Sequence, residues 1–421
     1  MVLNILQGII QSVISVLAVS WWFLLPIALG FIFWDFWKYY IYVSYLRSVK
    51  WVLLEIKIPA LIEKTPKAME QIFSAAYSLY SYEFNFVQKY WEGHLAEDFA
   101  SFELVGNGGG VHFYIRVPEY VRNAMEAAVY SQYPDAEISL AEDYRALFPK
   151  TLPNKIYDIM GFDYHLVRDN AYPIRTYEYF ESQKDETRLD PIAAITEVMS
   201  KLKDEEALWI QIFVRPTGTE WKKTAEVIRD KLIGRSKPAE PLGFFGHIGH
   251  FIRNLILAPA EYPIWPEDKK QEERSRMLLL SPGERDVVEA IDTKISKLGF
   301  DVNIRFIYID RRDSFTRLNV AATMSTFNQF NTLNLNAFRP NLKTMTIIRG
   351  NIKWFKKSRL WARKRLMYDN FMKMRWPKRR SILNIEELAT IYHFPTVVVE
   401  APLLRRLGAK KGEPPAGLPV E

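Results

Sequence analysis

One short segment of the chain combines many basic residues with aromatic ones, and its chemistry is that of binding. Between Leu342 and Arg380 the sequence has 14 Lys or Arg residues and one acidic residue, Asp369. The candidate binding residues are Lys353, Lys356, Lys357, Arg359, Arg363, Lys364, Arg365, Lys373, Arg375, Lys378, Arg379 and Arg380. Clustered ammonium and guanidinium groups bind phosphates, either in nucleic acids or in the headgroups of anionic lipids.

The aromatic residues of this segment predict how it folds. Trp354, Trp361 and Tyr368 recur every seven residues, which places them on one stripe of a helix expected over residues 350–374. Three interpretations of this helix stay open. The aromatic rings could stack on nucleic-acid bases while the charges neutralise phosphates. The helix could bind anionic lipid of the inner leaflet, or its stripe could pack on the domain while the charges face solvent or an acidic partner.

The sequence lacks the residue patterns of the common catalytic and metal sites. It has no cysteine, which excludes thiol catalysis, disulfides and Cys-ligated metals. It has no Gly-Lys dipeptide and therefore no phosphate-binding loop, and the glycines at 106–110 predict a hairpin turn instead. His247 and His250 could share a helix face, but no third ligand accompanies them. We therefore predict no enzymatic activity, no catalytic residue, no cofactor and no metal.

The N-terminus predicts a membrane anchor. Residues 1–34 contain no charged side chain, and about 20 helical residues suffice to cross a bilayer. The first basic residue follows this run, whereas a signal peptide has its basic residues before the apolar run. The predicted residues of the membrane interface are Trp34, Trp37, Lys38 and Tyr40. We expect a single-pass protein of the inner (cytoplasmic) membrane with its N-terminus outside and its main part in the cytoplasm.

The elements after the anchor predict an α+β fold. A strand over 51–58, a helix over 66–80, a strand pair at 102–105 and 111–117, a helix over 118–133 and a strand over 136–140 give the order β-α-β-β-α-β. This order is typical of ferredoxin-like (split βαβ) folds.

A similar order is expected to recur, with a shift of roughly 155–165 residues. Its elements are a strand over 207–214, a helix over 219–233, a helix that begins with a capping box at Ser281 and a strand over 301–309. The helix and strand at 286–309 would then correspond to 121–140. The predicted fold class is thus α+β, a single N-terminal transmembrane helix followed by duplicated ferredoxin-like cytoplasmic modules.

The expected organisation has six parts. They are the anchor and juxtamembrane segment at 1–48, a first ferredoxin-like module at 49–145, a connector at 146–206, a second module at 207–340 with an insertion at 234–280, the basic aromatic segment and a following strand at 341–400, and a Pro/Gly-rich linker or tail at 401–421.

Five strings in a shared order resemble a known family. They are Trp51–Pro59, Pro66–Glu70, Tyr133–Glu137, Arg188–Pro191 and Ile382–Pro395. They look like the membrane-proximal N-terminal region of type IV secretion and conjugative coupling-type ATPases of the HerA/FtsK superfamily, in the version found in candidate-phylum bacteria. The resemblance implies an anchor, a membrane-proximal domain and then a P-loop motor that moves DNA or protein through the envelope. Residues 410–419 look like the linker into that motor, and no P-loop motif can be carried over to this chain.

From the anchor, the basic segment and this resemblance we expect a non-enzymatic platform of a type IV secretion or conjugation-like machine. Its expected partners are the membrane, further copies of the chain or a separate P-loop ATPase, and DNA. Two alternatives stay open. The chain could be a membrane-anchoring subunit or shortened form of a P-loop motor whose ATPase domain lies elsewhere, or a lipid-binding envelope scaffold unrelated to DNA.

Overall fold

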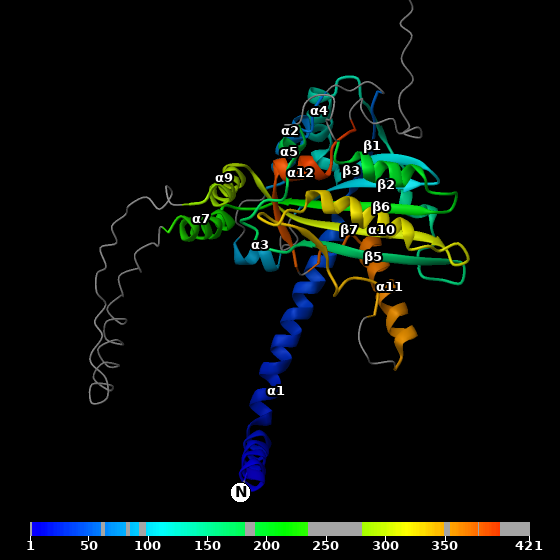
Figure 1. Cartoon of the computed structure of the whole chain (residues 1–421). Coiled ribbons are helices and arrows are strands. Elements are labelled where there is room, and N and C mark those ends of the chain that lie inside the picture. Colours follow the sequence, from blue (N-terminus) through cyan, green and yellow to red (C-terminus); the bar gives the residue numbers. More distant parts are fainter. Residues whose placement is uncertain are drawn as a thin grey trace, which may run out of the picture.

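One antiparallel sheet of nine strands forms the centre of the protein (Figure 1). The computed structural model describes residues 2–59, 64–80, 85–91, 98–181, 190–234, 280–348, 354–377 and 379–395, with the side chains of the first helix described from Ser20 onward. The strand order is β4-β1-β3-β2-β6-β7-β5-β8, and β9 pairs with β7 beside this path. The protein is therefore a mixed α+β structure with a large antiparallel sheet.

The first half of the sheet follows the predicted elements closely. Its strands are β1 (Trp51–Lys57), β2 (Ala100–Asn107), β3 (Gly110–Pro118) and β4 (Glu137–Leu140), and its helices are α2 (Lys67–Ala76) and α4 (Arg122–Gln132). The predicted hairpin turn joins β2 to β3. Gly108 and Gly109 have φ angles of 52° and 80° there, in the left-handed region that glycine adopts without a steric penalty. The strand order within this half is β4-β1-β3-β2.

The second half continues the same sheet. Its strands are β5 (Tyr157–Leu166), β6 (Ala207–Pro216), β7 (Gly299–Arg311), the short β8 (Phe338–Pro340) and β9 (Ser381–Asn384). The halves join where β2 pairs with β6 from Ala100 opposite Val214 to Asn107 opposite Ala207. Neighbouring strands all pair antiparallel, so both halves share one uninterrupted ladder of hydrogen bonds.

Two layers cover the sheet. On one face, α2, α4, α6 (Ala193–Ser200), α10 (Leu318–Phe327) and α12 (Ile385–Ile391) contribute side chains to the main hydrophobic core. On the other face, α11 (Lys356–Met372) packs its C-terminal half on alternate residues of the same strands, such as Trp209 and Ile307. Because both faces are covered, β6 and β7 are buried along nearly their whole length.

A row of polar side chains lies on the α11 face, buried in the middle of the sheet. Glu103, Gln211, Arg305 and Asp163 stand directly opposite one another across β2, β6, β7 and β5. Gln211 Nε2 donates to Glu103 Oε1 at 3.0 Å, and Arg305 Nε donates to Asp163 Oδ1 at 2.8 Å. Burial opposes ionisation of Glu103, but the charges of Arg116 and Arg145 and the hydrogen bonds from Arg116 and Gln211 together outweigh it and lower the pKa of this carboxyl. At these four positions the interior of the sheet therefore contains hydrogen-bonded charged and amide side chains instead of apolar ones.

The structure corrects two parts of the predicted organisation. The range 146–206, expected as a connector, contains β5, which lies between β7 and β8 in the sheet. The helix α9 (Pro282–Ser296) and strand β7 do not correspond to α4 and β4, because β4 is an edge strand while β7 lies inside the sheet. Gly161, Asp163 and His165 interrupt the apolar pattern of β5, which is why the strand was not recognisable from the sequence.

Helices α9 and α7 (Glu220–Ile233) pack on each other beside one end of the sheet (Figure 1). The capping box predicted at Ser281 is present, with Ser281 N donating to Glu284 Oε2 at 2.8 Å. The expected insertion between these helices, with His247 and His250, falls on residues 235–279, which lie outside the described residues.

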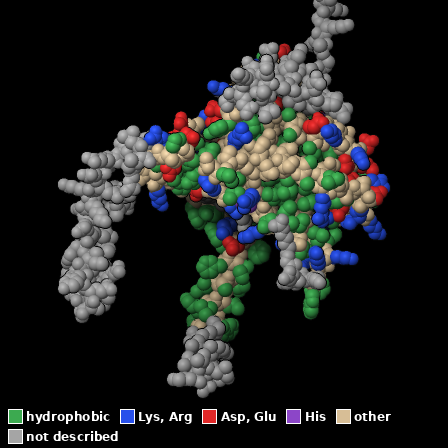
Figure 2. Space-filling view, in the orientation of Figure 1, with side chains coloured by type: hydrophobic (Ala, Val, Ile, Leu, Met, Phe, Trp, Pro, Cys, Tyr) green, Lys and Arg blue, Asp and Glu red, His purple; other side chains and the backbone are tan. Residues whose placement is uncertain are grey.

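The N-terminal helix α1 (Val2–Ser48) projects away from the sheet (Figure 1). Its segment from Ser20 to Ser48 is long and apolar enough to cross a membrane. Hydrophobic side chains cover this segment in Figure 2. One N-terminal helix therefore qualifies as a membrane span by length and composition.

Gly161 lets α11 lie directly on the sheet. A Cβ atom at this position would be 2.9 Å from Phe306 O and 3.0 Å from Met367 Cγ of α11. We expect Gly161→Ala to lower the free energy of unfolding by about 1–3 kcal/mol, because the helix must shift to make room. Urea unfolding of the full chain in detergent measures this. Gly283→Ala is the control, since nothing lies within 4 Å of its added Cβ, and equal stability of the two variants would contradict the prediction.

Candidate functional site

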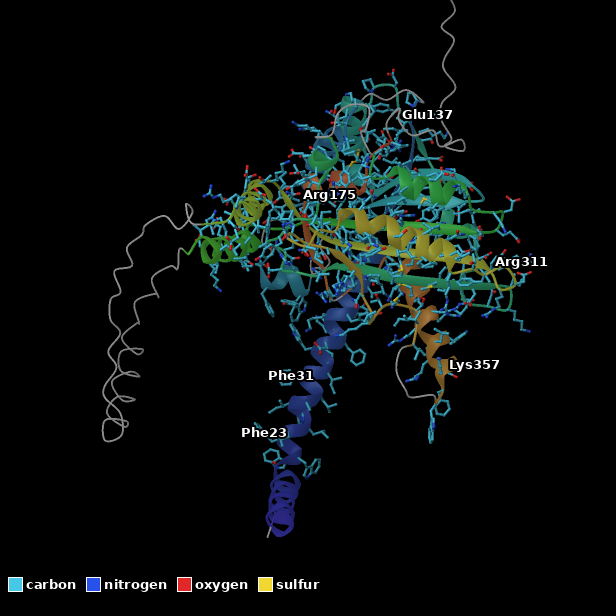
Figure 3. All side chains as sticks on the ribbon, in the orientation of Figure 1. Phe23, Phe31, Glu137, Arg175, Arg311 and Lys357 are labelled. Atoms are coloured by element: carbon cyan, nitrogen blue, oxygen red, sulfur yellow. The ribbon has the colours of Figure 1, made fainter. Side chains whose placement is uncertain are left out.

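The helix α11 is half buried and half projecting. Met367, Tyr368 and Phe371 in its C-terminal half are buried against the sheet. At the other end Trp354 is 80% exposed and Phe355 is 76% exposed. The helix leaves the body on the same side as α1, and its free end carries the labelled Lys357 (Figure 3). Its N-terminal half thus projects from the body on the side of the anchor.

This division corrects the predicted aromatic stripe. Trp354 and Trp361 are exposed, but Tyr368 is only 1% exposed and donates its hydroxyl to Pro149 O at 2.9 Å. Tyr368 is therefore part of the core and cannot stack on a ligand. Spacing of seven residues identifies one face of a helix, but it does not show where the covering sheet ends.

Arg305 holds the C-terminal end of α11. Its Nη1 donates to Asn370 O at 2.9 Å, and its Nη2 donates to Arg375 O at 2.9 Å. Asn370 O belongs to the last turn of α11, whose carbonyls lack partners within the helix and carry partial negative charge, and Arg375 O belongs to the segment after the helix. The buried guanidinium donates to both while its Nε donates to Asp163. The polar row of the sheet therefore fixes the buried end of the projecting helix.

The predicted basic residues do not form one patch. After the helix, Lys373 pairs with Asp369 at 2.6 Å and Arg380 pairs with Asp301 at 3.1 Å. Arg379 donates to Leu166 O at 3.2 Å, and Arg375 contacts Asp369 at 3.3 Å. Arg379 and Arg380 thus hold this segment to the sheet, whereas Lys373 and Arg375 pair with Asp369 of α11 itself. Lys353 and Lys378 lie outside the described residues.

The other predicted basic residues within the described part of the chain lie on the helix itself. Lys356, Lys357 and Arg359 are exposed in its first turn. Arg363 donates to Ile347 O at 2.7 Å, and the guanidinium of Arg365 lies 5.8 Å from the ring centre of Trp361. Lys364 pairs with Asp158 at 2.6 Å. The structure therefore places six of the twelve predicted basic residues on the projecting helix.

A small aromatic cluster surrounds the anchor where it approaches the body. Trp34 lies 5.3 Å from Tyr90 between ring centres, and Trp37 Nε1 donates to Tyr90 O at 2.9 Å. Of the other predicted interface residues, Lys38 pairs with Asp35 at 2.6 Å and Tyr40 is 62% exposed. Trp34 and Trp37, which were predicted to lie at the membrane interface, thus contact Tyr90 of the body.

Tyr90 belongs to α3 (Phe86–Tyr90), a short helix that the sequence interpretation missed. Phe86, Val87 and Trp91 are each more than half exposed beside the anchor. A signal was present, because Asn85 and Gln88 form a capping box that begins this helix. The segment adds exposed apolar side chains next to α1.

The last turns of α1 are fixed to the body. Tyr45 donates its hydroxyl to Asp98 Oδ1 at 2.8 Å, and Arg375 Nη2 donates to Tyr39 Oη at 3.3 Å. Leu46 packs against the buried cluster of Phe99, Phe213 and Met374. Because α1 and α11 are both anchored on this face of the sheet, the direction of one is set relative to the other.

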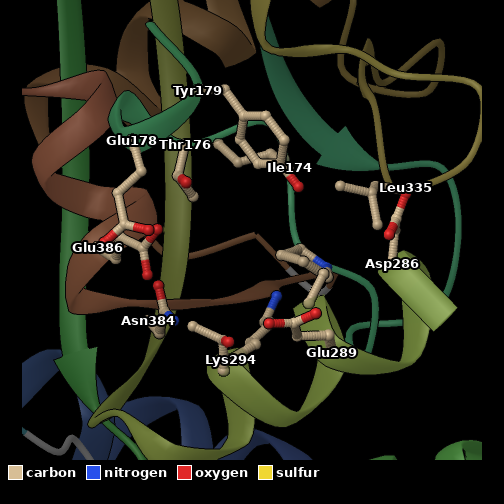
Figure 4. Close-up of a pocket in the computed structure, with 13 residues that line it drawn as sticks. Ile174, Thr176, Glu178, Tyr179, Asp286, Glu289, Lys294, Leu335, Asn384 and Glu386 are labelled. Atoms are coloured by element: carbon tan, nitrogen blue, oxygen red, sulfur yellow. The ribbon is translucent and has the colours of Figure 1, made fainter. Parts of the chain in front are cut away.

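A cavity of about 500 Å³ lies between α9, the start of α12, and α5 (Tyr177–Glu181) with the segment before it (Figure 4). Lys294 extends into its wall but is already engaged, with Nζ 3.0 Å from Glu387 Oε2 and 2.9 Å from Ile382 O. Burial and the nearby Glu386 raise the pKa of Glu178 at its rim. The paired Lys294 serves as a structural link, and among the described residues no group of three or more His, Asp or Glu could hold a metal ion.

Comparison with known proteins gives a family without an assigned activity. No curated protein matches the sequence. Residues 56–403 match the family model described as "Domain of unknown function (DUF8128)", and this range runs from the last two residues of β1 through β9 and includes both helical layers of the sheet. As this match covers well over half of the 421 residues, the chain belongs to the DUF8128 family.

Proposed function

We propose that this protein is a non-enzymatic, membrane-anchored platform whose sheet domain is held against the membrane at two points. The first point is α1, and the second is the projecting end of α11. The observation that carries the proposal is that both leave the same side of the body, with Trp354 and Phe355 bare at the tip of α11 (Figures 1 and 3). Indole rings beside basic residues favour the boundary between headgroups and acyl chains.

The same geometry favours lipid over nucleic acid as the partner of the basic segment. The tip of α11 combines bare apolar rings with Lys356 and Lys357, and its direction is that of the anchor. A bilayer crossed by α1 therefore lies where α11 points. Anionic headgroups attract basic residues near the surface with about 1 kcal/mol each. In this arrangement the main part of the chain is cytoplasmic and the N-terminus of α1 lies outside.

We also propose that the two halves of the sheet are duplicated ferredoxin-like modules. The order β4-β1-β3-β2 has the same pattern as β8-β5-β7-β6, and this parallel supports the proposal. The equivalent strands are then β1 and β5, β2 and β6, β3 and β7. Helices α7 and α9 would belong to an insertion in the second module.

The wider role that we propose is that of a platform in a type IV secretion or conjugation-like machine, which rests on the resemblance of the five strings described above. The partner would be a further copy of the chain or a separate P-loop ATPase, and DNA is the expected cargo contact. Stoichiometric binding of a P-loop ATPase from the same genome to the full chain would support this role. Binding to anionic lipid without affinity for DNA or an ATPase would favour the alternative of an envelope scaffold.

The absence of cysteine allows a direct test of the membrane contact. An environment-sensitive dye is attached to Ser358→Cys near the tip of α11, or to Glu137→Cys on the opposite side of the body (Figure 3), in the full chain in lipid nanodiscs. We expect blue-shifted emission and quenching by bromine-labelled acyl chains at position 358 but not at 137. Equal, unquenched emission from both positions would contradict the proposed function.

A further inference from the structure

We propose that a hollow beside α11 binds the phosphoryl headgroup of an anionic membrane lipid; this inference rests on the proposed function. The hollow has a volume of about 470 Å³ and lies between the projecting half of α11 and the adjacent end of the sheet. Its lining residues are Pro153, Asp158, Arg312, Lys357, Ser358, Leu360, Trp361 and Lys364. We call it the α11 hollow.

The charges of the α11 hollow suit a phosphate. Arg312, Lys357 and Lys364 face a single carboxylate, that of Asp158, which leaves an excess of two positive charges. Lys364 Nζ lies 2.6 Å from Asp158 Oδ1, whereas Arg312 Nη1 is 3.9 Å from Oδ2, too far for a strong hydrogen bond. The carboxylate therefore neutralises mainly Lys364, and Arg312 and Lys357 keep donors for phosphate oxygens.

The fold sets the positions of Arg312 and Lys364. Arg312 Nε donates to Asn154 O at 2.7 Å, and Arg312 N donates to Ile156 O at 2.8 Å, so the loop before β5 holds the base of its fork. Lys364 is held by Asp158 of β5 and lies 5.5 Å from the ring centre of Phe315. A guanidinium held through Nε still offers its Nη groups, which match the spacing of phosphate oxygens.

The remaining wall suits the apolar part of a lipid rather than a free ion. Pro153, Leu360 and Trp361 line the hollow, and the indole of Trp361 is 51% exposed. The hydroxyl of Ser358 adds a donor beside them. A phosphate that carries a glycerol and acyl chains can place its charge on Arg312 and Lys357 while its apolar part meets Trp361. Inorganic phosphate leaves that wall uncovered.

The α11 hollow also lies where such a lipid can reach it. Lys357 and Lys364 of its lining belong to α11, which leaves the body on the same side as α1 (Figure 1), and Arg312 directly follows β7. In the orientation proposed above, the projecting half of α11 faces the membrane, so a lipid can approach the hollow from the leaflet. A small headgroup such as that of phosphatidic acid, with up to two negative charges, matches the excess of two positive charges.

The test measures lipid binding to the full chain in detergent by native mass spectrometry. The probes are dioctanoyl phosphatidic acid, dioctanoyl phosphatidylcholine and inorganic phosphate. The test variant is Arg312→Gln/Lys357→Gln, and the control is Lys223→Gln/Lys231→Gln on α7, which removes the same charge far from the hollow. We expect the test variant to bind phosphatidic acid at least about tenfold more weakly than the control, from the loss of two charge-assisted contacts.

Each outcome decides the proposal. Preference for phosphatidic acid over phosphatidylcholine and inorganic phosphate, lost in the test variant alone, supports it. Equal binding of phosphatidic acid by both variants overturns it, and so does binding of inorganic phosphate as tight as that of phosphatidic acid, since the site would then be a phosphate site. A dye on Lys356→Cys, which is exposed at the tip of α11 and does not line the hollow, reports the membrane contact separately. Quenching of this dye without lipid selectivity would overturn the hollow and leave the platform standing. Circular dichroism checks that both variants fold.

Discussion

Replacing Arg305 by methionine should lower the free energy of unfolding by about 3–5 kcal/mol, because it leaves a buried charge without its partner. Arg305 and Asp163 are 1% and 3% exposed, and the Nε–Oδ1 distance is 2.8 Å. The same guanidinium donates to Asn370 O and Arg375 O at the end of α11. The substitution therefore removes three hydrogen bonds and strands one carboxylate. Urea unfolding of the full chain in detergent measures the loss.

The control is Arg339→Met on β8, where the side chain is exposed and the change should stay within about 0.5 kcal/mol. Hydrogen exchange adds a local readout, since amides of α11 should exchange faster in Arg305→Met than those of α4. The double variant Arg305→Met/Asp163→Asn should lose less than Arg305→Met alone, because no charge is then stranded. If Arg305→Met is as stable as Arg339→Met, the account of how α11 is held is wrong.

The second large effect is expected at Lys294. It and Glu387 are fully buried, and Glu387 also accepts from Ile174 N at 2.8 Å. Burial raises the pKa of Glu387 and lowers that of Lys294, each opposed by the charge of the other. Lys294→Met removes this opposition, so we expect a loss of about 3–5 kcal/mol near neutral pH. Lys223→Met, on the exposed side of α7, serves as the control in the same unfolding assay.

The loss in Lys294→Met should depend on pH. With its pKa raised above the ordinary 4.5, folded Glu387 binds a proton that the unfolded chain has already released. Stability then falls as the pH rises from 4.5 to the raised pKa, and the full loss is present above that value. Lys294→Met should therefore be closest to the parent protein at pH 4.5 or below. A loss that is independent of pH, or that is not reduced in Lys294→Met/Glu387→Gln, would show that the pair is not coupled as described.

Local signals in the sequence were sufficient for much of the fold. The capping box at Ser281 begins α9, and the glycines at 108 and 109 turn β2 into β3. Each of these depends on residues a few positions apart, so the sequence alone contains the physical cause. The first half of the sheet could be predicted for the same reason.

The position of β5 and the burial of the polar row depend on contacts between distant residues. Asn303 and Arg305 alternate with apolar residues in β7, which is typical of a strand with one face in water. That face is instead covered by α11, some sixty residues further along the chain, and both side chains are buried. Nothing within β7 itself could indicate this cover.

For the candidate site, the sequence identified the basic aromatic segment but not its division. Tyr368 is buried and Trp354 is exposed because α11 extends beyond the sheet between these two residues. The α11 hollow needed Asp158 and Arg312, which are separated from the helix by long stretches of chain. Its existence follows from the sheet order, which residue spacing does not encode.

The polar row has a consequence for how the two halves find their alignment. Side chains alternate between the two faces along β2 and β6, where the halves join, so a slip of two residues would keep every side chain on its own face. Such a slip would, however, move Glu103 from its place opposite Gln211 to one opposite Trp209 or Phe213. The buried carboxylate would then lie against an indole or a phenyl ring, away from the Gln211 amide that donates to it. The strands could pair in several registers that keep their apolar side chains on the same face. The hydrogen bonds among Glu103, Gln211, Arg305 and Asp163 select the one register that is observed.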